Sequence, residues 1–299
     1  MISRTFGFIL AVVAGVLLQR NQIYRVWLLL VGSGAGSELY SHIPAIPFIS
    51  GFFFWLERRG ILKTVRMSLG PGLVVMVAAL AIWAIGVTAK EEYIRANLAS
   101  WAMLSLVVWI MGSFILFYGP QAFRKALFPL GFLGFIVPIP SFILDPFINM
   151  LLVGSAEASN YTFKLLGVPV LRKGMVFDLP GLTIEVARQC SGVRSSLAFI
   201  MFALICAHLF LRRNLSKVLL LTSVIPMTII KNGFRIVTLG LLGAYVDKVY
   251  LTNHWLHRSG GIVFFVAVIL TIFVPTIWAL KYVESVRLKR NEGRAREGD

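Results

Sequence analysis

Long, predominantly apolar runs constrain this chain more than any other feature. A helix needs about 20 apolar residues to cross the roughly 30 Å hydrocarbon core of a bilayer. Runs of that length occupy residues 69–88, 97–119, 127–153, 190–211, 217–238 and 259–280. Shorter runs, interrupted by glycine and proline, occupy 5–18, 26–38 and 43–56. We therefore expect an all-α polytopic membrane protein with about eight transmembrane helices, within a range of about seven to nine.

The composition agrees with a membrane location and limits the partners. Hydrophobic residues fill 58% of the 299 positions, whereas soluble domains are only about 45–50% apolar. Lysine and arginine together number 29 against 13 acidic residues, which gives a net charge of +16. The basic residues gather in separate short loops between apolar runs and match no recognisable nucleic-acid-binding module. We expect membrane lipids, and not nucleic acid, among the partners.

Basic residues at the ends of the runs predict the orientation, because Lys and Arg near span ends accumulate on the cytoplasmic side. Counting spans places the main clusters on one side. They are Arg58, Arg59, Lys63 and Arg66; Arg124 and Lys125; Arg212, Arg213 and Lys217; and the tail from Lys281. Arg172 and Lys173 fall on the other side. The prediction is a multi-pass protein of the cytoplasmic (inner) membrane, with one transmembrane domain at 1–281 and a basic cytoplasmic tail at 282–299.

The longest polar stretch, 155–189, lies outside the membrane by the same count. Within it, "VPVLRKGMVFDLPGLTIEVA" has short apolar runs divided by Lys-Gly and Pro-Gly pairs. Such pairs mark turns between short strands. We therefore expect a small extracytoplasmic β-rich insertion near 168–188.

Counting along the predicted helices brings three reactive groups to one depth. Cys190 precedes a run of about 22 residues, roughly 33 Å of helix, so its thiol lies at the outer face. From Lys217 the chain rises about 27 Å to Arg235, again near the outer face. The segment "NHWLHRSGG" at the outer end of the last run carries His254 and His257. The choice between these two histidines is open.

A cysteine, an arginine and a histidine at one depth suffice for acyl transfer. The thiolate is the nucleophile and needs a nearby cation or base, and histidine can also protonate a leaving amine. Arginine binds a carboxylate or stabilises a tetrahedral oxyanion. Simpler interpretations remain: Cys190 as a small buried hydrophobe, and Arg235 as a side chain that snorkels to the interface. Cys206 lies mid-span, about 24 Å from Cys190, too far for a disulfide.

Other polar residues extend the candidate site. Lys231, one helical turn before Arg235, repeats its positive charge and favours an anionic partner. Arg194 either supports the thiolate or binds a substrate carboxylate. His42, in "ELYSHIPAIP", lies at the outer end of an early span, so it either joins the site or caps a helix. Three serines near the cysteine are interpreted as packing or hydrogen-bonding residues: Ser191, Ser195 and Ser196.

Several motifs resemble those of a known family. "CSGVRSS", "NGFRI" and "HRSGGIVFF", in that order and at span ends, resemble the three motifs of the exosortase and archaeosortase family. "YSHIPAIPFIS" with "FFFWLERR" resembles the family's N-terminal YSH motif and the span after it. "FPLGFLGFIVPIPSFI" is similar to its proline-rich span. The resemblance covers about residues 37–280.

The resemblance implies a membrane-embedded cysteine transpeptidase that needs no cofactor or metal. Its substrates would be proteins with a C-terminal sorting signal: a short motif of the PEP type, a transmembrane helix and a basic tail. The family's nucleophile falls on Cys190, its arginine on Arg235 and its histidine on His257. Candidate substrate-binding residues are Arg194, His42 and Tyr40.

The chain departs from the family pattern in two places. Arg188 and Gln189 precede the cysteine where small or acidic residues are commoner, which points to a different recognition motif. Ser259 is one position closer to His257 than in the usual H-x-x-S-G, although Gly261 keeps its spacing.

The alternative function is a transporter or a polysaccharide-export component without enzymatic activity. In that case Arg235, Lys231 and Arg194 would line an anion path. This alternative predicts internal repeats, and we see no fixed-period similarity between the halves of the sequence. It also predicts that Arg235→Lys is tolerated and that a thiol-blocking reagent acts only sterically.

Overall fold

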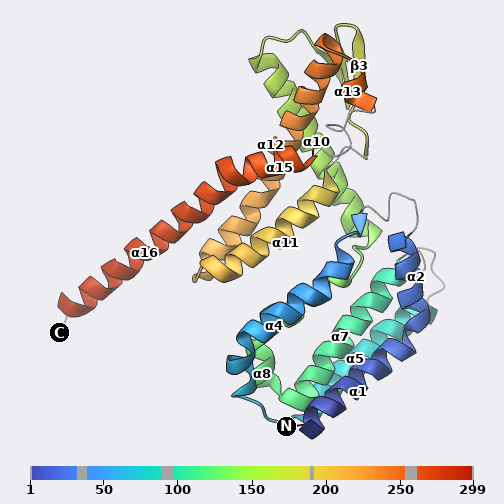
Figure 1. Cartoon of the computed structure of the whole chain (residues 1–299), viewed down its shortest axis with the longest axis vertical. Helices are drawn as coiled ribbons and strands as arrows, with labels where there is room; N and C mark the ends of the chain where they lie inside the picture. The colour runs from blue at the N-terminus through green and yellow to red at the C-terminus, as the bar shows by residue number, and fades with distance from the viewer. Residues whose placement is uncertain (1, 32–38, 89–96, 189–191, 253–260, 298–299) are drawn as a thin grey trace. The chain divides into compact units, whose positions relative to one another are not determined.

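The apolar runs form helices in the computed structural model, which describes residues 2–31, 39–88, 97–188, 192–252 and 261–297 (Figure 1). Among these residues, six helices are long and apolar enough to cross a membrane. A seventh candidate is the pair Ser3–Leu18 and Arg20–Leu28, bent by 67°. The predicted all-α polytopic fold is confirmed, and the seven candidates lie at the lower end of the expected range. The six are Leu69–Thr88, Leu98–Tyr118, Ser141–Leu165, Val193–Phe210, Asn214–Tyr245 and Gly261–Arg287.

The chain divides into two compact units, Met1–Leu144 and Asp145–Asp299. Helices are the regular secondary structure among the described residues of the first unit. Its longer helices are α1 (Ile2–Leu18), α2 (Arg20–Val31), α4 (Ile46–Leu62), α5 (Leu69–Thr88) and α7 (Leu98–Tyr118). Its shorter elements are η1 (Ile43–Ala45), α8 (Pro120–Lys125), α9 (Leu127–Phe132) and η2 (Leu133–Ile136).

Small residues let α5 and α7 pack closely in the first unit, side by side in Figure 1. A Cβ added to Gly72 would lie 2.5 Å from the Leu116 Cα, and one added to Gly112 would lie 2.9 Å from the Met76 backbone nitrogen. Neither position has room for a larger side chain. Close backbone approach through small residues is the usual way in which helices associate within a membrane.

The region predicted as one span at 127–153 is divided between two short helices, α9 and η2, and the start of a longer helix. After η2 the chain becomes extended at Val137, as expected before a proline, and Pro138 and Pro140 follow. A new helix, α10 (Ser141–Leu165), begins directly after them. Its first residue is held by Asn97, whose Oδ1 accepts from the Ser141 backbone nitrogen at 2.9 Å. The two prolines lack backbone donors, so no continuous helix passes through this segment.

The second unit contains most of α10, a small sheet and the remaining long helices. The strands β1 (Leu171–Lys173), β2 (Val176–Leu179) and β3 (Leu182–Glu185) pair antiparallel in chain order. The β-rich insertion predicted near 168–188 is therefore confirmed. The helices after it are α11 (Val193–Phe210), α12 (Asn214–Tyr245), α13 (Val249–Thr252), α15 (Gly261–Val268), the π-helix η4 (Ile269–Phe273) and α16 (Val274–Glu297).

Strand β1 carries Arg172 and Lys173, the two basic residues that the sequence places apart from the main basic clusters. Arg172 forms an ion pair with Glu157 of α10 at 2.9 Å, and Lys173 lies 3.7 Å from Asp178 of β2. Both cations have local acidic partners.

A buried acid connects α16 with the turn between α11 and α12. The Glu284 side chain is 5% exposed. Its carboxylate accepts from the backbone nitrogens of Arg212 at 3.1 Å and Arg213 at 2.9 Å. Helix α16 (Val274–Glu297) continues without a break past residue 281, the last residue before the predicted basic tail at 282–299.

Candidate functional site

Gly192 is the first described residue after Cys190 and directly precedes helix α11. Its φ of +71° lies in the left-handed region, which favours glycine. A Cβ there would also lie 3.2 Å from Asn232 Oδ1. Its carbonyl oxygen accepts from the Ser196 backbone nitrogen at 2.9 Å and from the hydroxyls of Ser195 and Ser196 at 2.9 and 2.8 Å. The start of α11 is thus fixed by three bonds to one carbonyl.

Lys231 of α12 lies against this turn. The residue is only 2% exposed, and its Nζ donates to Ser195 Oγ. Burying an ammonium away from water is costly unless hydrogen bonds replace its hydration. A residue of this kind within a membrane helix is a functional hypothesis by default.

Asn232 and Gly233 attach the same turn of α12 to α10. The Asn232 Nδ2 donates to Ser155 Oγ at 3.0 Å. Ser159 Oγ contacts the Gly233 carbonyl at 3.3 Å and donates to the Ser155 carbonyl at 2.8 Å. Both serines are fully buried. The "KNG" residues therefore join α10, α11 and α12, a role that the sequence motif alone does not reveal.

The two arginines of the candidate site lie in the same region of the second unit. Arg235 is half-buried and follows Lys231 by one turn of α12, a rise of about 6 Å. Arg194 is exposed and belongs to the first turn of α11. With Lys231 these residues give the region a strongly positive character. Such a region attracts an anionic group or stabilises negative charge that develops during a reaction.

The predicted nucleophile and base lie outside the described residues. This holds for Cys190, His254 and His257, whose placement in the site stays a prediction. Of the two residues that depart from the family pattern, Arg188 is described, whereas Gln189 is not. The Arg188 guanidinium bonds the Asp145 carboxylate of α10 on the exposed surface. The acidic partner of Arg188 was not predicted, because a residue 43 positions away carries no local sequence signal.

Tyr40 and His42 belong to the first unit. The Nδ1 of half-buried His42 lies 3.1 Å from the Leu39 carbonyl. Burial lowers the pKa of His42, and hydrogen bonds to the Leu39 and Phe135 backbones partly oppose that change. Tyr40 packs against buried Val26, Ile43 and Met103, and burial raises its pKa. His42 is also the residue that precedes η1, although its side chain makes no capping bond there.

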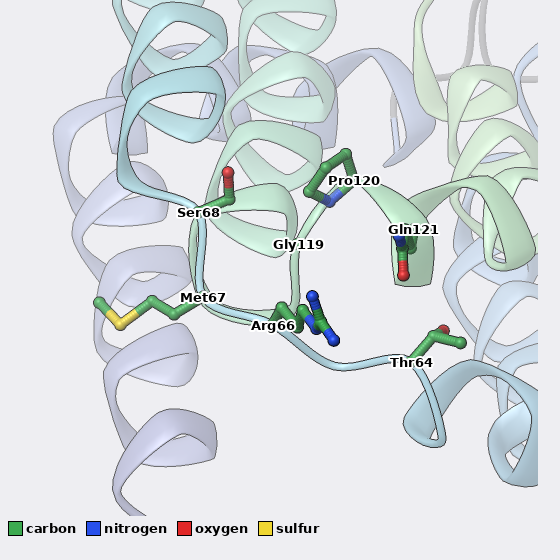
Figure 2. Close-up of a pocket in the computed structure, with 7 residues that line it drawn as sticks. All are labelled: Thr64, Arg66, Met67, Ser68, Gly119, Pro120 and Gln121. Atoms are coloured by element: carbon green, nitrogen blue, oxygen red, sulfur yellow. The ribbon is translucent and has the colours of Figure 1, made fainter.

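The first unit also has a cavity of about 240 Å³ between the α4–α5 connection and the start of α8 (Figure 2). Its lining contains none of the predicted site residues: Thr64, Arg66, Met67, Ser68, Gly119, Pro120 and Gln121. Backbone bonds from Arg66 to Tyr118 and from Ser68 to Leu116, both 3.1 Å, hold its two walls together. Within the described part of the chain, no group of three or more His, Cys, Asp or Glu side chains is placed to hold a metal ion.

Comparison with known proteins supplies the family. Neither the curated proteins nor the solved structures contain a match to this chain. The model of the transmembrane exosortase family matches residues 32–274. This range includes "YSH", the Gly192 turn, "KNGFR" and the histidine segment, and it extends over most of both units. The chain is thus a multi-pass membrane protein that belongs to the transmembrane exosortase family.

Proposed function

We propose that this protein is a membrane-embedded cysteine peptidase and transpeptidase that processes C-terminal sorting signals. One observation carries the proposal: the described part of the "CSGVRSS" motif contacts the "KNGFR" motif directly. Lys231 donates to Ser195, and Gly192 lies against Asn232. Two motifs that are about 40 residues apart in sequence thus form one structural unit, as a shared active site requires.

Cys190 serves as the nucleophile in the proposed mechanism. Its thiolate attacks the scissile carbonyl carbon, and Arg235 stabilises the resulting oxyanion or orients the recognition motif. His257 takes the proton of the Cys190 thiol, and when the C–N bond breaks it gives this proton to the departing amine. The product is a thioester between Cys190 and the N-terminal part of the substrate. An acceptor nucleophile, or water, attacks this thioester and releases the thiol.

The proposed substrates are membrane proteins that end in a short recognition motif of the PEP type, an apolar helix and a basic tail. The apolar helix would enter the bundle laterally from the lipid, which places the recognition motif beside Arg194 and Arg235. Arg194 would bind a substrate carboxylate, and Tyr40 and His42 would bind other parts of the substrate. Membrane lipids are further partners, and nucleic acid is not.

The proposed location is the cytoplasmic (inner) membrane, with the active site at the extracytoplasmic face and the C-terminus in the cytoplasm. The distribution of basic residues supports this orientation. The basic stretch of α4 contains Arg58 and Arg59, and α8 ends at Lys125. By this orientation both helices place their charged ends in the cytoplasm.

The proposal is tested by replacing the nucleophile. A Cys190→Ala variant, co-expressed with a protein that carries such a C-terminal signal, should accumulate the uncleaved precursor in the membrane. Cys190→Ser should retain little activity, because serine lacks thiolate character near neutral pH. Cys206→Ala is the matched control, since Cys206 is buried within the α11 and α12 core. Normal processing by Cys190→Ala would refute the proposal, and immunoblotting of precursor and product measures the outcome.

The alternative of an anion transporter or polysaccharide-export component rests on the positive region around Lys231, Arg235 and Arg194. It predicts that Arg235→Lys is tolerated, because a path for anions needs charge and not a planar guanidinium. The cysteine peptidase requires the bidentate geometry of arginine, so the same substitution should abolish processing.

A further inference from the structure

Lys231 is far more buried than a lysine whose ammonium group is hydrated by water. At 2% exposure it lies within α12, facing the first turn of α11, and Ser195 Oγ receives its hydrogen bond. Lysines ordinarily keep their ammonium groups in water while their methylene stems cover apolar surface. This one instead directs it into the interior of the second unit, where only a specific contact offsets the loss of hydration.

The directions of the hydrogen bonds define what Ser195 does. A serine hydroxyl has one proton, and that of Ser195 is donated to the Gly192 carbonyl at 2.9 Å. The Lys231 ammonium therefore donates to Ser195 and does not receive its proton. This arrangement differs from a serine–lysine nucleophile pair, in which the amine accepts the serine proton.

The bonds also define what Lys231 reaches. The Lys231 ammonium donates to the Ser195 hydroxyl, and that hydroxyl in turn donates to the Gly192 carbonyl. Gly192 is two residues after Cys190 in the sequence, and two residues of extended chain span at most about 7 Å. Two hydrogen bonds and two residues of chain thus connect the Lys231 ammonium with the cysteine.

We propose that Lys231 is a positioning residue: through Ser195 its ammonium holds the first turn of α11 and supplies fixed positive charge beside that turn. The proposal deepens, and rests on, the proposed cysteine chemistry. Positive charge near a thiol increases its thiolate fraction and hence its reactivity. Lys231 would thus act together with Arg235 without itself touching the substrate.

The experiment measures cysteine reactivity and needs no substrate. The chain has two cysteines, so Cys206→Ala leaves Cys190 as the single thiol. In this background, modification rates at pH 7 are measured with two methanethiosulfonates of similar size, one sulfonated and anionic, the other a cationic quaternary ammonium. The thiolate forms a disulfide with the reagent sulfur, and the S–S bond to the sulfonyl group breaks to release methanesulfinate.

Lys231→Met keeps the length of the side chain but removes its charge and donors. We expect both rates to fall, the cationic one by about tenfold, the effect of one unit in the thiol's ionisation equilibrium, and the anionic one by more than that. The ratio of the anionic to the cationic rate should also fall, because a nearby positive charge is gone. A merely structural role would not change that ratio. Lys231→Arg, which keeps charge and donors, should restore the rates to within about threefold of the parent.

Ser195 and Ser196 provide a matched pair. Both hydroxyls donate to the Gly192 carbonyl, but of the two only the Ser195 hydroxyl also accepts a hydrogen bond from Lys231. Ser196→Ala reports the effect of loosening this turn, and the additional loss in Ser195→Ala reports the contact with Lys231. If Lys231→Met does not yield folded protein by size-exclusion chromatography, this serine pair decides the question.

Three results would overturn the proposal. The first is a Lys231→Met variant whose modification rates and anionic-to-cationic ratio stay within about twofold of the parent. The second is an equal loss of modification rate in Ser195→Ala and Ser196→Ala. The third is a Lys231→Arg variant whose modification rates are as low as those of Lys231→Met. A result in which Cys190 is dispensable for processing, yet its reactivity still falls in Lys231→Met, would refute the proposed function and leave the role of Lys231 supported.

Discussion

Gly192 is constrained by its backbone conformation and by a neighbouring side chain. Its φ of +71° disfavours any L-residue, and a Cβ would lie 3.2 Å from Asn232 Oδ1. Gly181, in the turn between β2 and β3, has a similar φ of +74° but no neighbour within 4 Å of an added Cβ. The pair therefore separates backbone strain from crowding.

Alanine substitution at the two glycines should give unequal losses. Gly181→Ala should destabilise the protein by about 1–2 kcal/mol, the cost of a left-handed L-residue. Gly192→Ala should lose more than that and should also impair processing, because Asn232 must move. Chemical unfolding in micelles measures the first effect, and precursor cleavage measures the second. Equal stability losses and normal cleavage would show that the Gly192–Asn232 contact is unimportant.

The sequence predicted a role for Arg235 and a positive contribution from Lys231, because charges within apolar runs are conspicuous. It assigned Ser195 a packing or hydrogen-bonding role, which agrees with the bonds observed. It gave no signal for Ser155 or Ser159, since serines are common in membrane helices and their partners lie more than 70 residues away. Such pairings depend on how α10 and α12 pack, which local patterns do not encode.

At the scale of helices, the lengths of the apolar runs predicted well where the helices lie, but the extent to which prolines interrupt them was underestimated. The run at 127–153 is long enough to span, yet Pro138 and Pro140 separate η2 from α10. The predicted 217–238 span is longer in the structure, where α12 runs over 32 residues, Asn214–Tyr245. Hydrophobicity marks the part of a helix that contacts lipid, whereas a helix continues into polar surroundings wherever its backbone bonds continue.

Glu284 illustrates a contact between elements that hydrophobicity does not predict. Its carboxylate accepts from the backbone nitrogens of Arg212 and Arg213, which lie directly before α12 and so have no acceptor within that helix. Glu284→Ala should lower the free energy of unfolding by about 1–3 kcal/mol, because buried donors lose their acceptor. Glu185→Ala, at an exposed strand position, is the control and should change stability by less than about 0.5 kcal/mol. Similar values for both variants in chemical unfolding would contradict this role.

At the scale of the whole molecule, the sequence predicted the fold class, the β-rich insertion and the family. These properties follow from long apolar runs, from turn pairs such as Pro180-Gly181, and from motifs in a fixed order. The division into units at 144 and 145 was not predicted, because it depends on how helices associate and not on local composition. Catalysis by Cys190 stays a proposal, supported by family membership and by the contacts of the Gly192 turn.

The central claim is a thioester on Cys190, and mass spectrometry tests it most directly. The protein is mixed with a substrate carrying the C-terminal signal, quenched in acid and digested with trypsin. Cleavage after Arg188 and Arg194 releases peptide 189–194, which contains Cys190. We predict that this peptide carries the substrate fragment on sulfur and that neutral hydroxylamine removes it. Cleavage of substrate with no adduct on this peptide, or with a hydroxylamine-resistant adduct on a serine, would contradict the claim.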